Sequence, residues 1–147
     1  MTRTAAILLA LLAASGCASS GPPAVAEVRL VSLSPPAGSE LSKDTILVAD
    51  VEYTIRNFKP GVHYYVAPLF ASTKSGTTFN MLGNMAAAPA LAQPTGTVTV
   101  RYPISGELES RDLKRPVTVW FYVLEETGAG KARVIGQTEE LAFRTGG

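Results

Sequence analysis

The side chains that could carry out acid–base or nucleophilic chemistry are few in this chain. His63 is the only histidine, so it cannot join a cluster of histidines around a metal ion. The alternation in "VHYYVAP" places it on one face of a strand with Tyr65, Ala67 and Leu69. The sequence contains no G-x-S-x-G turn that would present a nucleophilic serine. We therefore expect His63 to be a strand-end residue and not a catalytic base.

Two pairs of carboxylates could in principle serve as acid and base, as in glycoside hydrolysis. Glu107 and Glu109 form one pair, and Glu125 and Glu126 form the other. Both pairs follow an alternating run and lie beside turn residues, where adjacent charges are usually solvated. We expect them at the surface and expect the chain not to be an enzyme.

Motifs for a metal ion or a phosphate group are also missing. Asp44, Asp50 and Glu52 do not fit the D-x-[DN]-x-[DN]-G loop that binds calcium. The stretch "GAGK" at 128–131 lacks the first glycine and the final hydroxyl residue of a phosphate-binding loop. The sequence thus predicts no metal ion, no cofactor and a hairpin turn at 128–131.

The charges of the chain are nearly balanced. Lys and Arg number 13 and Asp and Glu number 12, which argues against nucleic acid as a partner because such binders need a basic surface. Arg111, Lys114 and Arg115 form one basic group in "SRDLKRP". A solvated connector is the favoured interpretation of this group, and a contact with an anion or a lipid head group is the alternative.

The N-terminal residues have the pattern of an export signal. Arg3 supplies a positive charge and precedes the apolar run "AAILLALLAA" at residues 5–14, as in the n-region and h-region of a signal peptide. A helix that spans a bilayer needs about 20 apolar residues, so this run is too short for a permanent anchor. Residues 1–16 are expected to be removed.

The only cysteine follows this run. The stretch "ASGC" at 14–17 resembles the lipobox of bacterial lipoproteins, in which an aliphatic residue, a small residue and Gly or Ala precede the modified cysteine. Ala14 stands where that family most often has Leu. The resemblance implies that Cys17 becomes the N-terminus, carries lipid and attaches the protein to a membrane. A single cysteine has no disulfide partner within its chain, which fits lipidation; an ordinary cleavage site nearby is the alternative.

The residues after Cys17 bear on location. Ala18 and Ser19 follow it, and Asp is the residue that retains such lipoproteins in the inner membrane. The resemblance therefore implies a lipid anchor in the outer membrane, with the protein facing the periplasm of the cell envelope. Small and polar residues make 17–25 a flexible tether.

The rest of the chain alternates with a period of two, which is typical of half-buried strands. Residues 47–55 and 98–104 place apolar side chains on one face only, whereas 117–124 is apolar on both faces and should be a central strand. Turn-forming clusters interrupt the runs. Further strands are expected at 27–34, 62–72 and 132–144, the last interrupted near Gly136. This spacing predicts an all-β fold, a single antiparallel β-sandwich over residues 26–146.

Two stretches resemble immunoglobulin-like and fibronectin-like domains. They are "VSLSPPAGSEL" at 31–41 and "GTVTVRYPI" at 96–104, which are similar to the first strand with its turn and to a middle strand of such sandwiches. The resemblance implies an immunoglobulin-like sandwich. The Cys-Trp-Cys pattern of antibody domains is missing, and a transthyretin-like sandwich of similar size is the alternative.

One connection is long and unusually apolar. Residues 72–95 contain Phe79, Met81, Leu82 and Met85 and only a short expected strand near 77–82. Long connections are uncommon in compact domains, and exposed apolar side chains mark interaction sites. These four residues are our candidate partner-binding loop, although a lid on the hydrophobic core is the favoured interpretation of the segment.

Together these features indicate a lipid-anchored cell-envelope protein whose β-sandwich domain binds a partner or supports a structure without catalysis. The membrane, through Cys17, is one expected partner, and an envelope protein is a second. Two alternatives are an envelope hydrolase and an accessory lipoprotein of a secretion or surface-assembly machine.

Overall fold

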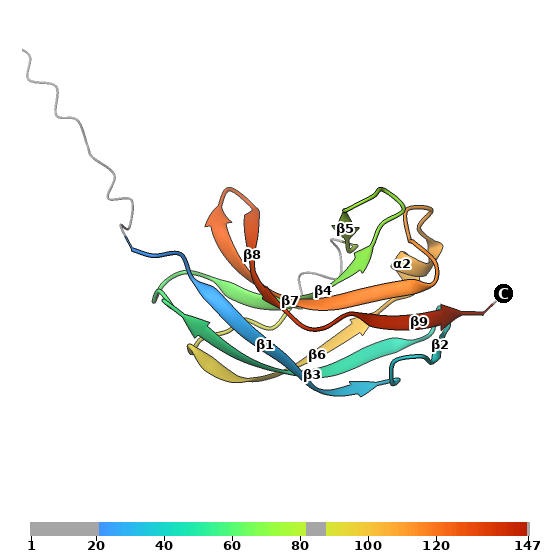
Figure 1. Ribbon diagram of the computed structural model, residues 1–147, viewed down its shortest axis with the longest axis horizontal. Helices are drawn as coiled ribbons and strands as arrows, with labels where there is room; N and C mark the ends of the chain where they lie inside the picture. The colour runs from blue at the N-terminus through green and yellow to red at the C-terminus, as the bar shows by residue number, and fades with distance from the viewer. Residues whose placement is uncertain (1–20, 82–87, 147) are drawn as a thin grey trace, which may run out of the picture.

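Two β-sheets packed face to face make up the protein (Figure 1). The computed structural model describes residues 21–81 and 88–146. The smaller sheet has the order β1 (Val25–Ser34), β3 (Ile46–Arg56), β6 (Thr95–Pro103). The larger has the order β2 (Glu40–Leu41), β9 (Leu141–Thr145), β7 (Val117–Gly128), β4 (Tyr64–Ala71), β5 (Thr78–Phe79), and β8 (Lys131–Gln137) also pairs with β7.

The pairings confirm the predicted all-β class and antiparallel sheets. Among the described strands, only β2 and β9 run parallel, and the remaining neighbours are antiparallel. A short helix, α2 (Ser105–Glu109), follows β6. Five residues are too few to show a helical period, so the sequence pattern did not predict it.

Alternating apolar side chains fill the space between the sheets. On β3 every second residue from Leu47 to Ile55 is buried, and Asp50 and Glu52 lie on the opposite face, as predicted. On β7 the inward residues have no exposed surface; they are Val117, Val119, Phe121 and Val123. Burying such side chains stabilises a fold by about 1.5–3 kcal/mol each relative to exposure.

The outer face of β4 and β7 is apolar as well. Ala67, Tyr122 and Leu124 are buried there, with Tyr65, Leu69 and Trp120 packed partly exposed around them. β7 lies between β4 on one side and β8 and β9 on the other. The prediction that 117–124 is a central strand is confirmed, whereas its outer face is covered only in part, since Tyr65, Leu69 and Trp120 stay partly exposed there.

The outer face of the smaller sheet is charged and self-paired. Arg29 pairs with Glu52, and Arg56 pairs with Glu27, each across β1 and β3. Asp50 accepts hydrogen bonds from the hydroxyls of Ser32 and Thr99, both at 2.6 Å. Because these bonds favour the ionised form, they lower the pKa of Asp50 below its ordinary value of 3.8.

The last expected strand is two strands. β8 ends at Gln137 and β9 begins at Leu141, so the interruption lies just beyond Gly136, where the sequence predicted it. The predicted hairpin turn at 128–131 joins β7 to β8. Gly128, Ala129 and Gly130 have positive φ there, a conformation that glycine adopts without steric cost.

The two ends of the sandwich differ. The first residue of β1 pairs with Arg56, and its last pairs with Val48. β1 therefore begins at one end of the sandwich, while α2, β2 and the last residues of β9 lie at the other end (Figure 1). Within residues 21–81 and 88–146, no helix combines the length and apolar character needed to cross a bilayer.

Candidate functional site

The predicted partner-binding loop is described in part. Phe79 lies on β5 and packs partly buried against the main core. Met81 is 42% exposed. Leu82 and Met85 lie outside the described residues, as does Cys17. Partner binding by this loop therefore stays a prediction.

Both ends of this long connection are fastened to β4. Phe70 pairs with Phe79 at its start. Near its end the N–H of Leu91 donates to the carbonyl of Tyr64 at 2.8 Å, and Leu91 is buried. The connection leads from β4 in the larger sheet to β6 in the smaller sheet. Its described ends bury Leu91 fully and Phe79 in part, which favours the lid interpretation for these two residues.

The expectation of a solvated Glu107 was wrong. This residue is 1% exposed because α2 turns its side chain inward. Its Oε1 accepts hydrogen bonds from the backbone N–H of Met81 at 2.8 Å and from the Tyr102 hydroxyl. The described residues supply no partner for its Oε2. Glu107 therefore joins α2 to Met81, two residues after β5.

Replacing Glu107 by Ala should destabilise the domain by about 1–3 kcal/mol, because it leaves the Met81 N–H without its acceptor. Urea denaturation measures this free energy, and faster amide exchange at Met81 should accompany it. Glu109→Ala is the matched control, since Glu109 lies on the same helix and is exposed, and its effect should stay within about 0.5 kcal/mol. Equal effects of the two substitutions would contradict this role.

The second carboxylate pair is divided between the two faces of β7. Glu125 was also expected in solvent, but it is 6% exposed and forms an ion pair with Arg133. It faces inward because residue 125 continues the alternation of Val117 to Val123. Glu126 points outward as expected.

Glu126 reaches the only histidine on this outer face. Its Oε2 lies 2.9 Å from His63 Nδ1, and both side chains are about half exposed. The His63 ring stacks on Tyr65 with 5.3 Å between centroids. Burial, with the charge of Glu126, raises the pKa of Tyr65. Among the described residues, no three His, Cys, Asp or Glu side chains gather in a way that could hold a metal ion.

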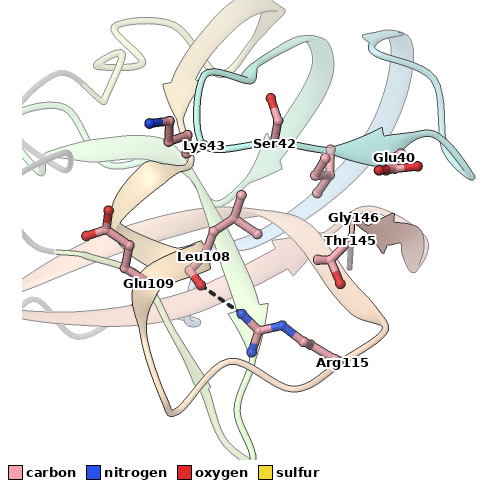
Figure 2. A pocket seen from close by; sticks show the side chains of 9 residues that line it. Glu40, Ser42, Lys43, Leu108, Glu109, Arg115, Thr145 and Gly146 are labelled. Carbon is pink, nitrogen blue, oxygen red and sulfur yellow. Dashed lines mark hydrogen bonds between the residues drawn. The ribbon is translucent and has the colours of Figure 1, made fainter.

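One hollow of about 370 Å³ lies where β2, β9 and α2 meet (Figure 2). Lys43, Glu109, Glu40 and Arg115 supply both signs of charge around Leu108. The guanidinium of Arg115 turns into this hollow and donates to the carbonyl of Leu108 at 2.7 Å. The opposed charges leave it without a preference for one kind of ion.

A second hollow of about 590 Å³ lies on the other side of Arg115, and we call it the Trp120 hollow. Its lining is Ala71, Ser72, Thr73, Ser75, Gly76, Thr77, Thr78, Lys114, Arg115 and Trp120. Its walls meet because Ser72 and Leu113 form an isolated antiparallel bridge. The Lys114 N–H donates to the carbonyl of Ala71 at 3.0 Å, and the Thr73 N–H donates to the backbone carbonyl of Asp112 at 2.8 Å.

The sequence analysis named several residues that line the Trp120 hollow, but it did not predict that they lie together. Lys114 and Arg115 stood out as a basic group, and an anion contact was the less favoured interpretation. Residues 72–78 belong to the long connection, but the candidate binding residues predicted there were the apolar ones that follow them. The hydroxyl-rich turn "STKSGTT" before Phe79 was the signal that could have pointed to a polar site.

Comparisons with protein-family models, with curated proteins and with solved structures found no match for this chain.

Proposed function

We propose that this chain is a bacterial lipoprotein, held at the cell envelope by lipid on Cys17, whose β-sandwich domain binds a partner without catalysing a reaction. The N-terminal pattern of charge, apolar run and "ASGC" supports the anchor. The outer membrane, with the domain facing the periplasm, is the proposed location.

The arrangement of the two ends is the observation that carries the binding role. The described chain enters the domain where β1 begins, whereas β2, β5 and α2, which lie beside the lining of the two hollows, are at the end where β1 finishes (Figure 1). Ten strand residues at about 3.3 Å each separate these ends by about 30 Å. A domain anchored at Cys17 therefore holds its hollows away from the bilayer, where a partner can reach them.

An immunoglobulin-like topology is the finer proposal for the fold. The smaller sheet has the order β1-β3-β6, and the larger sheet places β7 between β4 and β9. This arrangement corresponds to the A-B-E and C-F-G strands of immunoglobulin domains, and it favours that fold over a transthyretin-like sandwich.

The anchor has a direct test. Mass spectrometry of the mature protein from bacterial membranes should find a lipid-modified cysteine, Cys17, at the N-terminus. Cys17→Ser should move the protein from the membrane to the soluble fraction, because the lipid chains supply the membrane affinity. Ser19→Ala is the matched control and should leave it membrane-bound. An unmodified N-terminus at Ala18 or beyond would rule out the anchor.

A further inference from the structure

We infer that the Trp120 hollow binds a sugar ring that carries a carboxylate or a phosphate. This inference names a ligand class for the proposed binding domain and in that sense rests on the proposed function. It is carried by three kinds of groups that line one hollow: an aromatic face, hydroxyls and a cation without an ion-pair partner among the described residues.

The aromatic face comes from Trp120, which is partly exposed on the outer face of β7. Tyr122 packs edge-on against it with 6.4 Å between ring centroids, and Leu69 lies opposite on β4. These contacts fix the indole before any ligand arrives, so little side-chain entropy is lost on binding. A fixed aromatic face is a platform for the C–H face of a sugar ring, because a pyranose has one apolar face and polar edges.

The hydroxyls come from the β4–β5 turn. Thr77 already donates to the carbonyl of Lys74 at 2.7 Å, and Ser72 Oγ accepts from the Lys74 N–H at 3.1 Å, so these two residues hold the turn in shape. Within the described part of the chain, the hydroxyls of Thr73, Ser75 and Thr78 make no side-chain hydrogen bond. They can exchange water for the hydroxyls of a ligand.

The cation is Lys114. Arg115 lines both hollows, but its guanidinium is engaged with Leu108 on the other side (Figure 2). Lys114 has no ion-pair partner among the described residues, and the described lining of the Trp120 hollow contains no carboxylate. An anionic group on the ligand therefore gains attraction from Lys114 without repulsion inside the hollow.

The size of the hollow agrees with this ligand class. At about 590 Å³ it lies within the range of about 300–1,000 Å³ typical of small-molecule sites. Its hydroxyl residues and Lys114 disfavour a ligand that is apolar throughout, because burying them against such a ligand leaves their hydrogen bonds unmade. A bare inorganic anion would use Lys114 and leave Trp120 without a contact.

Trp120 is the only tryptophan, so its fluorescence reports directly on this hollow. The full chain, purified in a detergent without a sugar head group, is titrated with glucuronate, glucose 6-phosphate, glucose and inorganic phosphate. We expect a saturable change with glucuronate, with glucose 6-phosphate or with both, and the stronger binder identifies the preferred acid. Glucose should bind at least about tenfold more weakly, and inorganic phosphate should leave the fluorescence unchanged.

Two substitutions assign the contacts. Lys114→Gln should reduce the affinity for the acidic sugar to that for glucose, whereas Lys43→Gln, in the neighbouring hollow, should leave it unchanged. Trp120→Phe should weaken all sugars about tenfold, measured by calorimetry, and circular dichroism checks that each variant is folded.

Three results would overturn the inference: no sugar changes the fluorescence, glucose binds as well as glucuronate and glucose 6-phosphate, or inorganic phosphate alone reproduces the signal. These outcomes are independent of the state of Cys17. The ligand class can therefore fail while the anchor holds, and the anchor can fail while the hollow binds.

Discussion

Val119→Asp is expected to unfold the domain. Val119 lies in the middle of β7 with no exposed surface, and it pairs with Phe70 on one side and Leu141 on the other. A buried carboxylate without a partner there should cost about 4 kcal/mol or more, a large part of the 5–15 kcal/mol that typically stabilises a domain. Loss of the β-type circular dichroism spectrum, or a strongly lowered Tm, measures this effect.

The neighbouring position gives the control. Thr118→Asp introduces the same charge one residue earlier, where the side chain is only partly buried and faces the opposite side of the sheet. Its effect should be at most about 1 kcal/mol. A Val119→Asp variant that melts together with Thr118→Asp would contradict the inward orientation of Val119.

Gly136→Ala should destabilise the domain by about 3 kcal/mol, because β1 and β8 approach too closely at this point for a side chain. A Cβ atom on residue 136 would lie 2.3 Å from the carbonyl oxygen of Ala26. That oxygen belongs to the backbone of β1, so it cannot move without shifting the strand. Urea denaturation of the purified variant measures the loss.

Gly106→Ala is the control for Gly136→Ala, because it adds the same methyl group without a clash against the backbone. Its Cβ would lie 3.1 Å from Cγ of Met81, a flexible side chain that can turn away. Gly106 is also in α2, where Ala is favoured over Gly by about 1 kcal/mol. This variant should be as stable as the original protein or more so. An unaffected Gly136→Ala variant would show that β1 and β8 lie further apart.

The sheets could be predicted from the sequence because their signal is local. The alternation from Leu47 to Ile55 and the doubly apolar run at 117–124 each identify a strand and its faces without knowledge of any other segment. The turn at 128–131 could be predicted in the same way, since its glycines permit the positive φ that such a turn requires.

The polar features could not be predicted in this way because they depend on residues distant in sequence. Glu107 is buried since Tyr102 and Met81 converge on it, and nothing next to Glu107 in the sequence differs from an ordinary surface turn. The Trp120 hollow likewise exists because Ser72 and Leu113 meet. Periodicity identifies the face of a strand, but it carries no information about which loops come together at its end.

The position of β9 between β2 and β7 determines when the sandwich can be completed. Glu40 pairs with Arg144 and Val117 pairs with Phe143, so the larger sheet lacks two of its contacts until residues 141–145 are available. Pairings so distant in sequence form slowly, typically in milliseconds to seconds. If the chain is exported N-terminus first, as we propose, the larger sheet is complete only after residues 141–145 have also crossed the membrane.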